Sequence, residues 1–402
     1  MDKLDKIFDT FVNNNLFKNK SVLQSNYNPS IITHRDEQIQ SIASILAPAL
    51  RGERISNLFV YGNTGTGKTL SIQHVGDKMT SRLKEMSEEH LKFVYINCKL
   101  KKVADTEYRI LAEIIKELGG HVPATGLPTD QVYTRFVDLI DNEKQMIILV
   151  LDEIDQAVKK ISDNFIYSLT RLNTELKNAQ ISIIGISNSL TFMDNLDPRV
   201  RSSLGEEEII FSPYNALQLQ DILKERAEKA FKDGVLEEGV ISKCAAYAAR
   251  EHGDARRALD LLRVSGEIAE RESNKKITLK HIDMAKNKIE RDKMLDIIEG
   301  EPKQFQLVLY SIIMLESDTR REGGIFTGEV YNAYREICDK TKNEVLTQRR
   351  VSDVLAEFDM FGIINTHVVS KGRHGRMREI KLSLTPNIRQ KAKEILEKSL
   401  NS

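Results

Sequence analysis

The chain has 402 residues, 41% of them hydrophobic and 29% charged, and its 59 basic side chains balance 59 acidic ones. This length exceeds the size at which one core keeps growing, so we expect two or three domains, and the zero net charge means that any nucleic-acid surface must be local. No apolar run approaches the roughly 18 residues of a membrane span, and the start of the chain carries acids with no apolar signal core after them, so we expect no membrane partner and a cytoplasmic location. The three cysteines lack metal or redox spacing, which predicts that they are buried and inert.

The segment before the first motif has two parts. Residues 1–30 are rich in Asn and weakly patterned, which predicts a short helix followed by an extended arm that ends at Asn28-Pro29. From His34, apolar residues recur with helical spacing up to a break at Arg51-Gly52, which predicts an amphipathic helix.

Residues 62–69 read Gly-Asn-Thr-Gly-Thr-Gly-Lys-Thr and follow the apolar run Leu58–Tyr61, a predicted buried strand. In such a phosphate-binding loop the glycines turn backbone N–H groups towards the phosphates, Lys68 reaches the β and γ oxygens, and the Thr69 hydroxyl can ligate Mg²⁺ at a helix N-terminus. A chance glycine-rich turn is the alternative, and the motif that follows argues against it. The residues expected to hold a nucleoside triphosphate are Gly62, Asn63, Thr64, Gly65, Thr66, Gly67, Lys68, Thr69 and Leu70.

A second apolar run, Met146–Leu151, ends in Asp152 and Glu153. Two acids at the tip of a buried strand are costly to desolvate without a counter-charge. A Mg²⁺ ligand at Asp152 and a water-orienting base at Glu153 account for both acids and predict catalysis of triphosphate hydrolysis. An acidic N-cap on the next helix is the alternative, and it explains only one of the two.

Strands and helices alternate around these motifs. Apolar runs predict strands at Phe93–Cys98 and Ile181–Ile186, and the alternation predicts an α/β domain with a parallel sheet whose ligand lies at the carboxyl ends of the strands. Asn188 follows the last of these strands, where its amide can hydrogen-bond the γ-phosphate or the attacking water; a turn residue at a strand end is the alternative. The helices predicted between the strands span Thr106–Leu118, Thr129–Ile140 and 161–176.

Beyond Pro213 the strands stop, and helical patterns to about Arg291 predict a small helical lid. Arg256 lies one turn into one of these helices, so it faces the nucleotide if the lid folds over the sheet domain. A solvated arginine is the alternative. The lid helices are expected at Leu217–Ala230, Val240–Glu251, Ala255–Arg271 and from Thr278 onwards.

The last hundred residues have a different pattern. Helices are predicted at Phe305–Leu315, Thr327–Ile337 and Thr347–Phe361, and two alternating strands, Ile363–Val369 and Met377–Leu384, follow them. Two glycines between the strands suit a tight turn. Three helices followed by a hairpin indicate a winged helix-turn-helix domain.

The turn of this hairpin is basic: residues 371–381 hold five basic side chains and one acid in an otherwise neutral chain. Such a wing is typical of a phosphate-binding surface, and the preceding helix opens with side chains that reach base edges and phosphates in a major groove. A solvated basic turn is the alternative. The DNA-binding residues predicted here are Thr347, Gln348, Arg349, Arg350, Lys371, Gly372, Arg373, His374, Gly375 and Arg376.

Together these motifs resemble the AAA+ replication initiators of archaea, relatives of the largest eukaryotic origin recognition complex subunit and of the cell-division-control loader protein. Individually several motifs are weak, but their order along nearly the whole chain is specific. They are His34-Arg35-Asp36-Glu37, Ala47-Pro48-Ala49-Leu50-Arg51-Gly52, the phosphate loop, Gly126-Leu127-Pro128-Thr129-Asp130, Leu151-Asp152-Glu153-Ile154-Asp155, Arg199-Val200-Arg201-Ser202-Ser203-Leu204, Gly253-Asp254-Ala255-Arg256-Arg257-Ala258-Leu259 and the wing.

The resemblance implies roles that the residues alone only suggest. Asn188 would be sensor one and Arg256 sensor two. Arg201, with Arg199 as the alternative, resembles the arginine finger that reaches a neighbouring subunit's γ-phosphate.

Further positions follow from the same resemblance. Tyr214 and Arg226 match positions that line the nucleotide, which suits an aromatic ring and a cation beside a base and phosphates. Residues 119–136 match an initiator-specific insertion that touches DNA. Its expected DNA contacts are Thr125, Gly126, Leu127 and Pro128.

The implied organisation is an N-terminal arm at 1–30, an AAA+ parallel-sheet P-loop ATPase domain at 31–212, a helical lid at 213–295 and an α+β winged helix-turn-helix domain at 296–402. ATP or ADP and Mg²⁺ are the implied cofactors.

The implied function is a replication initiator that binds double-stranded origin DNA, hydrolyses ATP weakly as a switch and helps to recruit or load the replicative helicase, with self-association or a paralogue on DNA and a location on the nucleoid. One rival is a clamp or helicase loader that is blind to DNA sequence. Another is a signalling NTPase whose winged helix is autoinhibitory, although a docking surface that becomes buried would not need a strongly basic wing.

Overall fold

The computed structural model describes residues 15–88, 90–99, 106–123, 126–204, 206–317, 324–370 and 376–400, with side chains omitted from 368 to 377. Contacts divide the chain into two units, Met1–Ile282 and Asp283–Ser402, and the division falls within helix α12 (Leu279–Gly300). The first unit contains a sheet with an apolar core on each face, and the second has a core of its own.

The first unit is built on five parallel strands in the order β2-β3-β4-β1-β5. Every residue of the central strand β3 is buried, as expected where helices cover both faces of a parallel sheet. Four strands are confirmed as predicted; β5 was not predicted, because this edge strand begins with two exposed glutamates. The strands are β1 (Leu58–Gly62), β2 (Leu91–Asn97), β3 (Met146–Asp152), β4 (Gln180–Ser187) and β5 (Glu207–Phe211).

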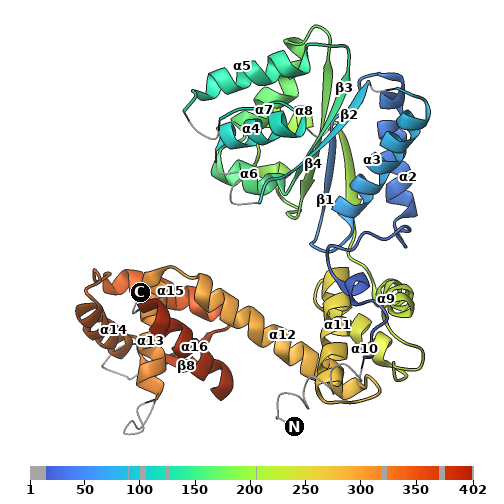
Figure 1. Ribbon diagram of the computed structural model, residues 1–402. Coiled ribbons are helices and arrows are strands. Elements are labelled where there is room, and N and C mark those ends of the chain that lie inside the picture. The colour runs from blue at the N-terminus through green and yellow to red at the C-terminus, as the bar shows by residue number, and fades with distance from the viewer. Residues whose placement is uncertain are drawn as a thin grey trace, which may run out of the picture. The chain divides into compact units, whose positions relative to one another are not determined.

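Helices cover both faces of this sheet (Figure 1). One face packs against α2 (Asp36–Leu46), the short 3-10 helix η2 (Ala47–Arg51) and α3 (Lys68–Glu85). The single helix expected at 161–176 is instead α7, which ends in the 3-10 turn η3 (Leu172–Thr174). The helices on the other face are α4 (Glu107–Glu117), α5 (Thr129–Ile140), α6 (Ile154–Lys160), α7 (Asn164–Arg171) and α8 (Pro198–Leu204), with η4 (Met193–Asn195) before α8.

The predicted lid helices are confirmed. The start of α11 is set by a capping residue: the Asp254 side chain accepts hydrogen bonds from the backbone N–H groups of Arg256 and Arg257. The helices are α9 (Ala216–Ala230), α10 (Val240–Arg250) and α11 (Ala255–Arg271), followed by α12.

The described part of the N-terminal segment, residues 15–33, packs on the lid rather than forming a free extended arm (Figure 1). It contains the 3-10 helix η1 (Lys20–Leu23). The Phe17 ring lies 4.7 Å from that of Phe231, and the Leu16 N–H donates to Oε1 of Glu270 at 2.8 Å. The buried residues of this segment follow neither the helical nor the strand period, so the sequence pattern did not reveal the contact.

The second unit has the predicted three helices and hairpin. Its antiparallel sheet has the order β6-β8-β7. Two elements were not predicted: β6 is only two residues long, and α16 buries only Ala392 and Leu396, which is a weak periodic signal. The elements are α13 (Lys303–Glu316), β6 (Ile325–Phe326), α14 (Thr327–Thr341), α15 (Gln348–Met360), β7 (Ile364–Ser370), β8 (Arg376–Leu382) and α16 (Pro386–Leu400).

Among the residues described, no helix combines the length and apolar character needed to cross a bilayer. The cysteines Cys98, Cys244 and Cys338 are free and buried, as predicted. Burial raises the pKa of the Cys98 and Cys244 thiols to about 12, so both remain protonated at neutral pH.

Phe17→Ala tests the docking of the N-terminal segment. Removing this buried ring should lower the free energy of unfolding of the first unit by about 3 kcal/mol. Urea denaturation followed by circular dichroism measures the change. Leu217→Ala is the control, because Leu217 is 72% exposed, and it should alter stability by no more than about 0.5 kcal/mol. Equal transition midpoints for the two variants would contradict the docking.

Candidate nucleotide-binding site

The phosphate loop joins β1 to α3 at the carboxyl edge of the sheet. Gly65 (φ +72) and Gly67 (φ +93) adopt the left-handed conformation that only glycine takes without strain. Gly67 is the N-cap of α3 and provides no side-chain hydrogen bond, so N–H groups of the first turn are left for a ligand. Of the predicted loop residues, 65–70 line a pocket, and 62–64 are not among its lining residues.

Lys68 is held beneath this loop, with 5% of its surface exposed. Its Nζ donates to the carbonyl oxygens of Gly62 at 2.7 Å and Asn63 at 2.8 Å, and to Oδ1 of Asn188 at 2.9 Å. The predicted lysine and sensor-one asparagine are therefore in contact. Burial lowers the pKa of Lys68 to about 8, which expresses the cost of a desolvated ammonium bonded only to neutral oxygens.

Thr69 and Asp152, predicted to hold a metal, are also in contact. The Thr69 hydroxyl donates to Oδ2 of Asp152 at 2.8 Å, and Asp152 is only 5% exposed. A hydroxyl and a carboxylate are the hard oxygen ligands that Mg²⁺ prefers, and it commonly keeps several waters and binds phosphate oxygens as well. The residues present therefore fit a Mg²⁺ ion bound together with a nucleotide.

Glu153 follows β3 and lines the same pocket. Its φ of +54 is unusual for a residue with a side chain, and such strain is often found at functional sites. Its Oε2 lies 3.5 Å from Nζ of Lys99, which follows β2. Sequence reasoning did not foresee this lysine, because a single charge after a strand carries no pattern.

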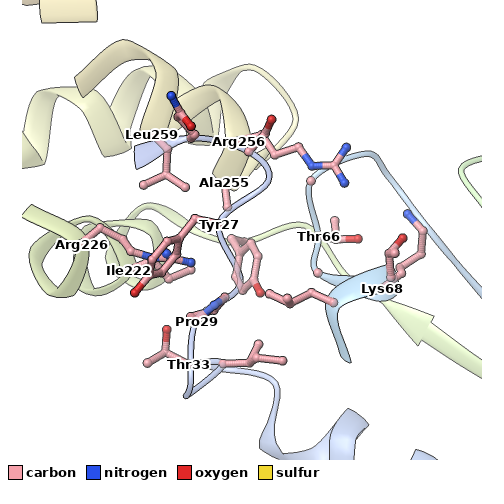
Figure 2. Close-up of a pocket in the computed structure, with 18 of the residues that line it drawn as sticks. Tyr27, Pro29, Thr33, Thr66, Lys68, Ile222, Arg226, Ala255, Arg256 and Leu259 are labelled. Carbon is pink, nitrogen blue, oxygen red and sulfur yellow. The ribbon is translucent and has the colours of Figure 1, made fainter. Parts of the chain in front are cut away.

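The lid meets the phosphate loop at the start of α11. The Ala255 N–H donates to the carbonyl oxygen of Gly65 at 3.2 Å. The adjoining Asp254 is close enough that a Cβ on Gly65 would overlap its carboxylate. Burial raises the pKa of Asp254. Arg256 is exposed and lines the pocket, and Figure 2 shows Arg256 and Lys68 at the phosphate-loop end.

Arg35 joins the phosphate loop to the start of the lid. Its guanidinium is buried, lies 3.9 Å from the Tyr214 ring, and donates to the carbonyl oxygens of Thr66 at 2.9 Å and Ser212 at 2.6 Å. Tyr214, predicted to line the nucleotide, does line the pocket. The sequence motif that contains Arg35 supported the resemblance but assigned this residue no role.

The other end of the pocket is lined by the N-terminal segment and the lid. The guanidinium of Arg226 lies 4.4 Å from the Tyr27 ring, and its Nη1 donates to the carbonyl oxygen of Val22 at 3.3 Å (Figure 2). Burial lowers the pKa of Arg226. The predicted Arg226 is thus part of the pocket. The lining residues that sequence reasoning missed are Gln24, Ser25, Tyr27, Pro29, Ile31, Ile32, Thr33, Tyr95, Asn97, Ile222, Glu225, Ala255 and Leu259.

The two candidate arginine fingers do not line this pocket. Arg201 pairs with Asp194 at 3.2 Å and Arg199 with Asp197 at 3.0 Å, and both arginine side chains are more than half exposed. Within one chain neither is therefore brought to the phosphate loop. A role at the nucleotide of a neighbouring copy stays a prediction for both.

The predicted DNA contacts lie in both units. Gly126, Leu127 and Pro128 precede α5, with Gly126 and Pro128 exposed. Thr347 caps α15, and the side chains that follow it, Gln348, Arg349 and Arg350, are exposed. Thr125 and the wing residues Lys371, Gly372, Arg373, His374 and Gly375 lie outside the described residues, as does the side chain of Arg376.

Gly65→Ala tests the contact between the phosphate loop and the lid. The added methyl group would overlap the Asp254 carboxylate, so this carboxylate must move away from the N–H groups of Arg256 and Arg257 that it caps. Amide hydrogen exchange of residues 254–257 should become about tenfold faster or more. Gly119→Ala is the matched control, because Gly119 also has a positive φ but has no neighbouring atom that the methyl group would meet. Unchanged exchange in the Gly65 variant would contradict the contact.

Comparisons with known proteins match the order of these parts. A model described as an AAA domain matches residues 53–193, a Cdc6 AAA+ ATPase-type lid domain matches 220–287, and a CDC6 C-terminal winged helix domain matches 296–392.

Relatives match over nearly the whole chain. An ORC1-type DNA replication protein of Pyrococcus abyssi is 53% identical over 391 residues, covering 95% of this chain and 91% of its own. ORC1-type DNA replication protein 1 of Methanosarcina acetivorans is 52% identical over 382 residues with the same coverages. The Aeropyrum pernix ORC1 protein, solved in complex with DNA, has a TM-score of 0.82 and 43% identity, covering 96% of this chain and 98% of its own. The resemblance seen in the motifs is thus confirmed, and the chain belongs to the family of ORC1-type DNA replication proteins, with an AAA+ parallel-sheet domain, a helical lid and a C-terminal winged helix.

Proposed function

We propose that this chain is an ATP-controlled replication initiator that binds origin DNA through its winged helix and the insertion in its ATPase domain. The observation that carries the proposal is its 43% identity, over 96% of the chain, to an Aeropyrum pernix protein solved in complex with DNA. Exposed Gln348, Arg349 and Arg350 at the start of α15 support it, since a helix N-terminus with such side chains suits a major groove. The basic wing would add phosphate contacts.

ATP and ADP are the proposed nucleotides, bound between the phosphate loop and the lid. Bound Mg²⁺, held by Thr69 and Asp152, would neutralise phosphate charge. Lys68 and Arg256 would stabilise charge on the phosphates, Asn188 would orient the γ-phosphate or the water, and Glu153 would polarise that water. Tyr214 and Arg226 would help to line the bound nucleotide.

Nucleotide state is proposed to act as the switch, with hydrolysis slow. The contacts of Ala255 with Gly65, and of Arg35 with both Thr66 and the Tyr214 ring, support this, because a ligand in the loop acts on residues that also contact the lid.

The proposed partners are the replicative helicase, which the protein helps to recruit or load, and a paralogue or second copy on DNA. In such an assembly Arg201 or Arg199 would reach the neighbouring nucleotide. The proposed location is the cytoplasm, in association with the chromosome.

Glu153→Gln should retain ATP binding and lose turnover by about a hundredfold or more, because the amide cannot accept a proton from the water. Binding of a fluorescent ATP analogue and single-turnover hydrolysis measure the two effects. The matched control is Glu85→Gln, an exposed acid at the end of α3, which should leave turnover unchanged. Wild-type turnover in the Glu153 variant would remove this residue from the proposed role.

The double variant Arg373→Ala and Arg376→Ala should weaken DNA binding and flatten its dependence on salt. If each arginine contacts one phosphate, the slope of log affinity against log salt falls by about 2. Fluorescence anisotropy with a DNA duplex at several salt concentrations gives this slope. Lys275→Ala with Lys276→Ala removes the same charge from an exposed turn of the lid and is the control. An unaltered slope in the wing variant would contradict the proposed DNA contact.

The function itself is tested by incubating the protein with ATP and sheared genomic DNA from its own source, capturing it at near-physiological salt and sequencing the retained fragments. Enrichment of one or a few loci that carry repeats is expected of an origin-binding initiator. Uniform retention would instead indicate a loader that is blind to sequence, and no retention would favour the autoinhibited NTPase.

A further inference from the structure

A tyrosine of β2, the strand that pairs with β3, contacts the proposed metal ligand Asp152. Tyr95 is in register with Val150 of β3, and Asn97 is in register with Asp152. Because side chains alternate along a strand, Tyr95 and Asp152 project from the same face of the sheet. The Tyr95 hydroxyl donates to Oδ2 of Asp152 at 2.6 Å, and Tyr95 lines the nucleotide pocket.

The hydrogen bonds of Asp152 fix the orientation of its carboxylate. Oδ1 accepts the backbone N–H of Glu153 at 2.9 Å. Oδ2 accepts two hydroxyl groups, that of Tyr95 at 2.6 Å and that of Thr69 at 2.8 Å. The terminal torsion of an aspartate has a broad energy profile, so a carboxylate held by fewer donors would rotate more freely.

The three hydrogen-bond donors to Asp152 come from different parts of the chain, so their roles differ. Glu153 follows Asp152 directly, and its backbone N–H is present whatever its side chain. Thr69 belongs to the phosphate loop and is itself a proposed metal ligand, so its hydroxyl must serve both the carboxylate and the ion. Of these three donors, Tyr95 alone is neither the chain neighbour of Asp152 nor part of the phosphate loop, and it comes from a strand that carries no recognised motif.

The ring of Tyr95 has a separate structural role. It packs, partly buried, against the apolar cluster between the sheet and helices α2 and α3. A phenylalanine would keep this packing and remove only the hydroxyl. Removing the hydroxyl oxygen alone therefore separates the packing of the Tyr95 ring from its hydrogen bond to Asp152.

We propose that Tyr95 is a positioning residue that holds the Asp152 carboxylate in the orientation required to bind Mg²⁺ together with ATP. Groups that hydrogen-bond to a metal ligand orient it, and their removal typically costs about tenfold to a hundredfold in metal affinity. This inference rests on the proposed nucleotide function and assigns to that site a residue that no motif identifies.

The test is Tyr95→Phe in the full-length protein, with a ribose-labelled fluorescent ATP as the probe. Its affinity is measured in EDTA and across a Mg²⁺ titration. We expect an unchanged affinity in EDTA and a rise of about tenfold in the Mg²⁺ concentration that half-saturates the Mg²⁺-dependent gain in affinity. Tyr133→Phe is the control, because the Tyr133 hydroxyl lies 3.3 Å from Glu175 and Tyr133 does not line the pocket.

Each other outcome overturns the inference. Identical Mg²⁺ titrations of Tyr95→Phe and the wild type would mean that the hydroxyl does not position the ligand. A parallel loss of affinity in EDTA and in Mg²⁺ would mean that Tyr95 only shapes the pocket. A wild-type protein that binds no nucleotide in either condition would overturn the proposed nucleotide site itself, which distinguishes that failure from the first two.

Discussion

The site depends on a cation placed where water cannot solvate it. The ammonium of Lys68 is buried at the carboxyl edge of the sheet, and three neutral oxygens, from Gly62, Asn63 and Asn188, are its hydrogen-bond partners. The partial charges of these oxygens replace only part of the solvation that the ammonium loses on burial. The uncompensated cost of desolvation lowers the pKa of Lys68. An anion entering the loop would complete the compensation. The same oxygens meanwhile keep the side chain in place, so the loop is arranged before a ligand arrives.

Two contacts connect this loop to the lid, and they differ in character. The backbone contact of Ala255 with Gly65 is a direct one, at the N-terminus of a helix. The second contact is made through a bridging side chain. Arg35 donates hydrogen bonds to the carbonyl oxygens of Thr66 in the loop and Ser212 before the lid, and its guanidinium stacks on the Tyr214 ring. A buried arginine with two carbonyl acceptors is hard to displace on one side alone, because the freed acceptor or donor would be left unsatisfied. Loop and lid are therefore expected to respond to a ligand together.

The sequence predicted the nucleotide-binding motifs and the elements with long apolar runs. It did not predict contacts between residues that are distant in the chain. The apolar runs of β1, β3 and β4 and the spacing of the lid helices predicted the sheet and lid. The alternation of strands and helices predicted that the phosphate loop, Asp152 and Asn188 would lie at the carboxyl ends of the strands. By contrast, β5 is an edge strand with exposed acids, and residues 15–33 have no period because their partners lie in the lid. Tyr27, Lys99 and Tyr95 were missed for the same reason. Each belongs to the site through a contact with a residue distant in sequence, which is Arg226, Glu153 and Asp152 respectively.

The N-terminal segment has a consequence for the order in which the chain folds on the ribosome. Leu16 bonds a residue 254 positions later, and Val22 accepts a hydrogen bond from one 204 positions later. Because synthesis proceeds from the N-terminus at about 5–20 residues per second, the sheet can assemble while the first residues made still lack a partner. The wall of the pocket formed by residues 24–33 is then completed only after α11 has emerged. A ligand that needs this wall would meet a finished site late in synthesis, with the second unit still to come.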